Sequence, residues 1–356
     1  MRYCIIYLTV CLLPFTALCQ SLKVPFVKGV YGNPAALLDK GFTFKSLGIN
    51  AIFVRSASLD TDLYEAAKSD SVQVYVEFPT LNGAEYLANH PEAWPVNEKG
   101  IRAPAADWFM GICLTDPGFR DDRLKELKTI LGEFKVDGIW LDYLHWHAQF
   151  ETPEPILPET CFCDRCIKQF EKDANIQVPG ADISQRATWI LSQKDSSWRV
   201  WRTEILNHWV LDLKNVLKES RPQALLGIYY CPWYPADFDG AQYRILGLDL
   251  KALSGIVDVF SPMLYHTMMK RPPAWVEEYT QWLGGQSFMQ DGKTLIWPIV
   301  QAENKSGTIS PQEFSQVMTG GSRLPATGIM MFSLHSLLTD TKKLEVMKGL
   351  YLGNHK

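Results

Sequence analysis

The sequence predicts an α/β fold, a single (β/α)8 TIM barrel with extended βα loops. Three observations lead to this fold class. Eight strand-like apolar runs alternate with helical segments along the chain, and such alternation is typical of a parallel sheet covered by helices. No stretch has the composition of a linker between domains. The length of 356 residues suits one barrel with long loops.

The first four β/α units of this barrel can be recognised in order along the sequence. Strands are expected where β-branched and aromatic residues gather, over 24–31, 50–54, 72–76 and 136–143. Helices are expected over 34–47, 59–68 and 116–134. The third of these begins with Asp116 as N-cap and Pro117 at the first helical position. The connection 78–115 is long, and loops of that length usually serve a site.

The second half of the chain repeats the alternation. Strands are expected over 225–230, 256–264, 295–301 and 328–332. Helices are expected over 161–173, 183–220 and 337–350, and another starts at Ser310, which forms a capping box with Glu313. Trp198, Trp201 and Trp209 recur at helical spacing, which predicts a packing stripe.

Residues 1–19 are expected to be a signal peptide. Arg2 precedes an apolar run, and Ala17 and Cys19 place small residues before Gln20. The barrel then occupies 20–356, and the protein is expected to be exported to the periplasm or the cell exterior. A lipoprotein anchor at Cys19 is the alternative, which the bulky Leu18 disfavours. No later stretch is apolar enough to span a bilayer.

The composition indicates which class of molecule the protein binds. A formal net charge of -4 gives no basis for binding nucleic acid, which requires clustered Lys and Arg. The chain contains 12 Trp and 14 Tyr, whose faces are common in sugar-binding clefts. An oligo- or polysaccharide is therefore the expected partner, and no organic cofactor is expected.

The predicted strand ends supply the candidate catalytic groups. Asp142 ends the fourth strand and Glu303 follows the seventh, and these strands lie across the mouth of a barrel from each other. Two carboxylates across a cleft are the minimum for glycoside hydrolysis. The sequence leaves open which of them attacks and which protonates. The expected substrate-binding residues are Arg55, Glu77, Tyr143, His145, His147, Trp233, Tyr265, His266 and His335.

A cluster of cysteines predicts a structural zinc site. Cys161, Cys163 and Cys166 form a C-x-C-x2-C run, and Cys113 lies upstream in a loop. Four thiolates close a tetrahedral zinc site without an open position for catalysis. One or two disulfides are the alternative, although Cys231 makes the count odd once the leader is removed.

Several motifs resemble a known family. His90-Pro91-Glu92-x-Trp94, Cys113-Leu-Thr-Asp-Pro117, DGIWLDY at 137–143 and CFCDRC at 161–166 resemble uncharacterised bacterial glycosyl-hydrolase-like TIM barrels. The cysteine spacing is similar to family 42 β-galactosidases, in which it binds zinc near the active site.

This sequence also departs from those families. Leu141 precedes Asp142, where the β-galactosidases have an Asn-Glu pair. In the α-fucosidase type, a strand-four Asp is the nucleophile. Leu144 stands where the chitinase signature needs its catalytic Glu.

The resemblance and the strand-end carboxylates together predict an exported glycoside hydrolase of unknown specificity. The alternative is a carbohydrate-binding barrel without catalysis, in which Trp94, Trp108, Trp233 and Tyr265 bind the sugar. A metal-dependent hydrolase is a third possibility, but His145-x-His147 lacks an evident third ligand.

Overall fold

The computed structural model describes residues 26–106 and 108–353, so the predicted signal peptide lies outside the described residues. Nine parallel strands close into a barrel, because β5 pairs with both β4 and β6. Their bounds are β1 Val27–Tyr31, β2 Ala51–Arg55, β3 Gln73–Pro79, β4 Gly138–Asp142, β5 Leu225–Tyr230, β6 Val259–Leu264, β7 Leu295–Ile296, β8 Ile299–Gln301 and β9 Gly328–Phe332.

The predicted count of eight barrel strands is confirmed, because β7 and β8 share one position. Both pair with β6, and together they cover the predicted strand 295–301. The break falls at Trp297-Pro298. Proline has no N–H to donate to a sheet ladder, so the strand is interrupted there and resumes at Ile299.

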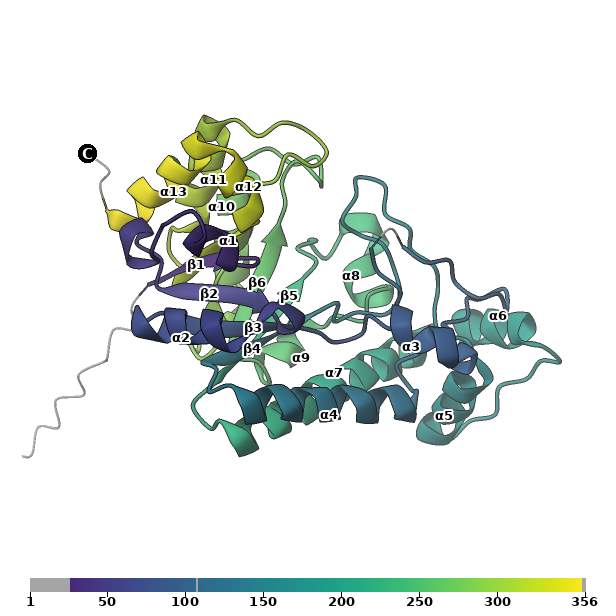
Figure 1. Ribbon diagram of the computed structural model, residues 1–356. Helices are drawn as coiled ribbons and strands as arrows, with labels where there is room; N and C mark the ends of the chain where they lie inside the picture. The colour runs from purple at the N-terminus through teal and green to yellow at the C-terminus, as the bar shows by residue number, and fades with distance from the viewer. Residues whose placement is uncertain (1–25, 107, 354–356) are drawn as a thin grey trace, which may run out of the picture.

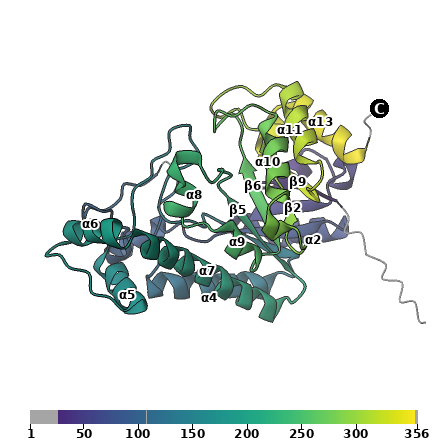
Figure 2. The same cartoon turned by 180° about the vertical axis from the view of Figure 1, so that it is seen from behind.

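The helices lie on the outside of the barrel (Figures 1 and 2). The long ones are α2 Thr61–Ser69, α4 Pro117–Glu133, α5 Asp164–Ala174, α6 Ile183–Gln193, α7 Asp195–Ser220, α10 Trp275–Gly284, α11 Pro311–Gly321 and α13 Thr341–Leu352. The short α-helices are α1 Ala35–Leu38, α3 Ala84–Asn89, α8 Ala241–Arg244, α9 Leu250–Ser254 and α12 Leu334–Thr339. The 3-10 helices are η1 Lys45–Leu47, η2 Ser56–Ser58, η3 Pro91–Ala93, η4 Asp237–Asp239 and η5 Ser287–Met289.

The helix α7 packs along α4. The predicted tryptophan stripe is buried, since Trp198, Trp201 and Trp209 are each at most 4% exposed. Trp209 packs against Phe119 of α4, whereas Trp198 and Trp201 pack against Phe170 of α5. In Figure 1, α5 and α6 project to one side, well beyond the barrel strands. No helix within 26–106 and 108–353 is long and apolar enough to cross a membrane.

Three predicted helices differ from the structure. The segment 34–47 forms only α1 and η1, because Gly41 and Gly48 adopt positive φ angles of 79° and 71°, which end a helix. The segment 183–220 divides at Lys194 into α6 and α7. The segment 337–350 divides at Asp340, whose carboxylate accepts from the first N–H groups of α13.

The capping box predicted at Ser310 is half right. The Ser310 hydroxyl accepts from Glu313 N at 3.1 Å. The Glu313 carboxylate does not return to the cap, because it pairs with His266 at 3.0 Å. Glu313 therefore links α11 to the loop that follows β6.

Aromatic side chains fill the barrel below its C-terminal end. Phe53, Tyr75, Trp140 and Trp297 pack together, with ring centroids 4.7 to 6.3 Å apart. Trp140 fits only because strand β5 carries Gly227, where a Cβ atom would lie 2.1 Å from the indole. The indole N–H of Trp140 donates to Ser261 Oγ at 2.9 Å.

This packing predicts that Gly227→Ala destabilises the barrel. The added methyl group meets a fully buried indole, and overpacking of this kind costs about 1–3 kcal/mol. Gly132→Ala is the matched control, because nothing lies within 4 Å of its added Cβ in α4. It is expected to stabilise the helix by about 0.5–1 kcal/mol. Thermal denaturation compares the two variants, and a Gly227→Ala protein as stable as wild type contradicts the packing argument.

Candidate active site

The strand residues two positions beyond the aromatic layer form the floor of a cavity. Side chains alternate along a strand, so positions i and i+2 face the same side. Each of the eight barrel positions contributes one such residue to the cavity lining: Tyr31, Arg55, Glu77, Asp142, Tyr229, Met263, Ile299 and Phe332. The cavity has a volume of about 410 Å³, at the small end of the range for ligand pockets.

Glu77 lies on the floor, where two donors hold its carboxylate. The side chain is 1% exposed. Tyr31 Oη donates to Glu77 Oε2 at 2.6 Å, and Arg55 Nε lies 3.3 Å from Oε1. A buried carboxylate with a charged partner and a hydroxyl donor is fixed in position. Glu77 can therefore serve as a rigid acceptor for a ligand hydroxyl group.

Asp142 lies beside Glu77 at the tip of β4. Burial, together with the negative charges of Glu77 and Glu151, raises the pKa of the Asp142 carboxyl well above its usual value. The two side chains Asp142 and Glu77 also share a hydrogen bond, which requires a proton on one of the two carboxyl groups. Tyr143 N donates to Asp142 Oδ1 at 2.8 Å.

Glu151 brings a third carboxyl group to the cavity from the loop after β4. Its pKa is raised to about 7, chiefly by burial and to a smaller extent by the negative charge of Glu303. The Lys305 ammonium and a hydrogen bond from Trp108 act in the opposite direction. A carboxyl group that titrates near neutral pH can act as a general acid or base.

One wall of the cavity consists of the loops after β3 and β4. Hydrogen bonds of His147 connect the two loops. Gly111 N donates to His147 Nδ1 at 3.0 Å, so the proton of the neutral ring is on Nε2, which lies 2.7 Å from Pro104 O. The Phe109 ring stacks on Tyr143 at 5.1 Å with an interplanar angle of 3°. Burial lowers the pKa of His145 to about 4, so this ring is neutral at pH 7.

The four predicted cysteines come together behind this wall. The sulfur atoms of Cys113, Cys161, Cys163 and Cys166 all lie within 4.8 Å of one another, and all four residues are buried. Cys113 Sγ is 3.5 Å from Cys163 Sγ and 3.4 Å from Cys166 Sγ. A disulfide has a sulfur separation of about 2.05 Å, and the cysteines are free. The cluster can bind a metal ion.

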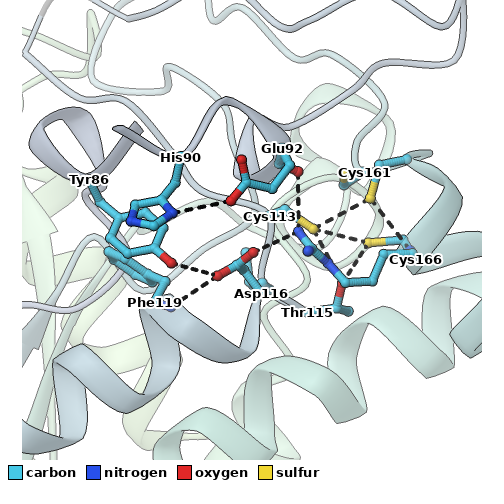
Figure 3. A network of polar contacts seen from close by, with 12 residues as sticks. Tyr86, His90, Glu92, Cys113, Thr115, Asp116, Phe119, Cys161 and Cys166 are labelled. Carbon is cyan, nitrogen blue, oxygen red and sulfur yellow. Dashed lines mark hydrogen bonds and ion pairs between the residues drawn. The ribbon is translucent and has the colours of Figure 1, made fainter. Parts of the chain in front are cut away.

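A second polar network joins the cysteine cluster to the start of α4 (Figure 3). Asp116 accepts hydrogen bonds from Phe119 N and from Tyr86 Oη. Its other oxygen pairs with Arg165 at 2.9 Å. Burial alone would lower the pKa of Arg165, but the charges of Cys113, Asp116 and Cys163 outweigh it and raise that pKa. A permanent cation therefore lies next to the thiol groups.

The structure brings together six of the predicted active-site residues. They all line the cavity: Arg55, Glu77, Asp142, Tyr143, His145 and Tyr265. The others lie outside its lining: His147, Trp233, His266, Glu303 and His335. His266 is fully buried against Glu313. Trp233 packs against Phe150 and Phe238, and His335 lies in the first turn of α12.

Two cavity residues have no clear signal in the sequence. Glu151 belongs to a polar stretch that resembles a solvated loop, and only the folded loop partly buries it. Lys305 lies in an exposed turn, yet its ammonium group contacts a ring from another loop. Trp108 was a candidate only for a binding site without catalysis, and it lies against Glu151.

Comparisons with known proteins support the fold. The sequence matches no protein-family model and no curated protein. The structure is similar to the glycoside hydrolase domain of PgaB (BpsB) from Bordetella bronchiseptica, with a TM-score of 0.66 and 11% identity over 92% of this chain and 99% of that one. It is also similar to a β-galactosidase from Bacillus circulans sp. alkalophilus, with a TM-score of 0.66 and 14% identity over 93% of this chain.

A third similar structure is α-L-fucosidase isoenzyme 2 from Paenibacillus thiaminolyticus, with a TM-score of 0.56 and 13% identity over 93% of this chain. This chain spans 56% of the β-galactosidase and 49% of the fucosidase. At these identities, the similarity establishes a barrel of the type used by glycoside hydrolases. The predicted resemblance to such barrels is confirmed at the level of structure.

Proposed function

We propose that the protein is a glycoside hydrolase in which Asp142 and Glu151 are the reacting carboxyl groups. The observation that carries this proposal is the presence of both groups, each with a raised pKa, in one cavity at the C-terminal end of the barrel. Hydrolysis of a glycosidic bond needs two carboxyl groups in different protonation states. The similarity of the fold to glycoside hydrolases supports the same reaction class.

The positions of the two carboxyl groups suggest their roles. Asp142 lies on the cavity floor at a strand tip, so its carboxyl group, once ionised, would attack the anomeric carbon of a sugar held above it. Glu151 lies beside Trp108 and Lys305, which come from loops. Its proton would pass to the leaving oxygen, and the carboxylate would then activate water. Glu77 and Arg55 would bind sugar hydroxyl groups.

Glu303, the partner expected from the sequence, is the rival to Glu151. Its negative charge acts on Glu151, so it lies near the cavity without forming part of the lining. Under the proposal, Glu303 shifts the titration of Glu151 and takes no direct part in the reaction. Substitution of each residue separates these two assignments.

The first prediction from this proposal concerns these substitutions. On a substrate identified by a screen of glycans and aryl glycosides, Asp142→Asn and Glu151→Gln are each expected to lower kcat/KM by about 10²- to 10⁴-fold. The loss in Glu151→Gln should be smaller for aryl leaving groups that need no protonation. Glu303→Gln is the matched control and should keep most of the activity. Full activity of Glu151→Gln on a natural glycan, or inactivity of Glu303→Gln, contradicts the assignment.

A binding-only barrel gives a different result in the same screen. It would bind a glycan saturably, and neither Asp142→Asn nor any other carboxyl substitution would change turnover, because there would be none.

The second prediction concerns pH. Glu151 acts as an acid only while protonated, so activity is expected to fall as the pH rises through about 7. Lys305→Met removes a charge that lowers the pKa of Glu151, and should move this alkaline limb to higher pH. Glu303→Gln removes a charge that raises the same pKa, and should move the limb to lower pH. If the alkaline limb of both variants lies at the same pH as that of wild type, a group other than Glu151 titrates there.

We further propose that the four cysteines bind a zinc ion. Tetrahedral bonds of about 2.3 Å place zinc-bound sulfur atoms about 3.8 Å apart, close to the 3.4 and 3.5 Å separations of the free thiols. The Arg165 cation beside the cluster offsets the charge of thiolate ligands. Such a site would fasten the loop after β3 to the start of α5.

Metal analysis of the purified protein provides the test. One zinc ion per chain is expected in wild type, and Cys166→Ser should lose nearly all of it and melt at a lower temperature. Cys231→Ser is the control, because Cys231 is also a buried free cysteine but lies outside the cluster. Equal zinc contents in the two variants, or a wild-type protein without zinc, contradict the proposal.

A further inference from the structure

A contact between two distant loops spans the cavity. Lys305 Nζ lies 3.5 Å from the centroid of the Trp108 ring, in a cation–π contact. Trp108 follows β3 and Lys305 follows β8, the third and seventh positions of the barrel, which are opposite each other. Both residues line the cavity together with Glu151, which also hydrogen-bonds to Trp108. We call Trp108, Glu151 and Lys305 the bridge.

The Lys305 side of the bridge is anchored by buried groups. Gln301 is fully buried, and its Nε2 donates to Glu303 O at 2.9 Å and to Lys305 O at 3.0 Å. Its Oε1 accepts from Thr267 N and Oγ1 at 3.1 and 2.7 Å. The buried Lys343 Nζ donates to Ala302 O at 2.8 Å and to Asn304 Oδ1 at 2.9 Å.

The Trp108 side has its own anchors. The next residue, Phe109, stacks on Tyr143 and packs against His145 and His147. His147 in turn contacts the backbone of Pro104 and Gly111, on either side of Trp108 in the chain. Each half of the bridge is therefore held independently of the contact between the halves. The position of this contact across the cavity follows from these two supports.

A contact across the cavity limits the substrates that fit. A polysaccharide lying across the barrel would have to pass between Trp108 and Lys305, which are in contact. A chain end can instead enter the cavity of about 410 Å³, with the rest of the chain outside. Because Asp142 is on the floor and Glu151 belongs to the bridge, the bond that joins the enclosed sugar to the chain lies between them.

We propose that the protein releases single sugars from the non-reducing end of a glycan chain and that the bridge excludes internal cleavage. This inference rests on the proposed function. The enclosed sugar must contribute its own anomeric carbon to the scissile bond, because the leaving group points to the mouth. Such a sugar is the non-reducing terminus. Trp108 and Lys305 are then residues that determine specificity.

Oligosaccharides of two to six units, labelled at the reducing end, test the proposal on the full-length protein. Wild type is expected to shorten each chain by one unit at a time. Trp108→Ala and Lys305→Ala should raise the ratio of internal to terminal cleavage by about tenfold or more, whatever their total rate. Lys293→Ala is the control, because Lys293 is an exposed lysine outside the cavity lining and should leave that ratio unchanged.

Binding to Asp142→Asn provides a second readout without turnover. Its affinity for the same series is expected to change by less than about threefold between two and six units, since one terminal sugar makes the contacts. Internal cleavage by wild type, or affinity that rises steeply with chain length, overturns this inference and leaves the proposed function intact. If the protein neither binds nor cleaves any glycan, both this inference and the proposed function are overturned.

Discussion

The aromatic layer inside the barrel determines where the cavity begins. Phe53, Tyr75 and Trp140 each lie two residues before a charged residue on the same strand, namely Arg55, Glu77 and Asp142. Because side chains alternate along a strand, the rings that fill the barrel place these charges directly above them. The layer needs small residues on neighbouring strands, above all Gly227. The same strands thus supply both the apolar aromatic layer and the charged side chains that line the cavity above it.

The loops supply the walls above this floor. The loop after β4 carries Glu151, and it is joined to the loop after β3 by His147 and by the four cysteines. Gln301 and Lys343 hold the loop after β8 from the opposite side. The protonation of Glu151 depends on that loop as well, because Glu303 and Lys305 act on its pKa in opposite directions. The loop after β8 therefore both contacts Trp108 across the cavity and shifts the pKa of Glu151.

The sequence was sufficient for features that depend on local patterns. The barrel followed from apolar runs and helix caps, and Asp142 followed from its place at the end of such a run. The cysteine cluster followed from spacing. The helix over 34–47 was wrong, because Gly41 and Gly48 turn the chain. Glu151 and the contact between Trp108 and Lys305 were beyond prediction, since burial and proximity of residues far apart in the chain are set only by the folded loops.

The central claim is that Asp142 attacks the sugar while Glu151 protonates the leaving group. A 2-deoxy-2-fluoro glycoside with a good leaving group, matched to the sugar found by the screen, traps a covalent intermediate on the attacking carboxylate. Mass spectrometry of the digested protein then locates the label. Our account predicts one sugar per chain, on the peptide that contains Asp142. A label on Glu151 or Glu303, or turnover of the true substrate with inversion and no label, contradicts it.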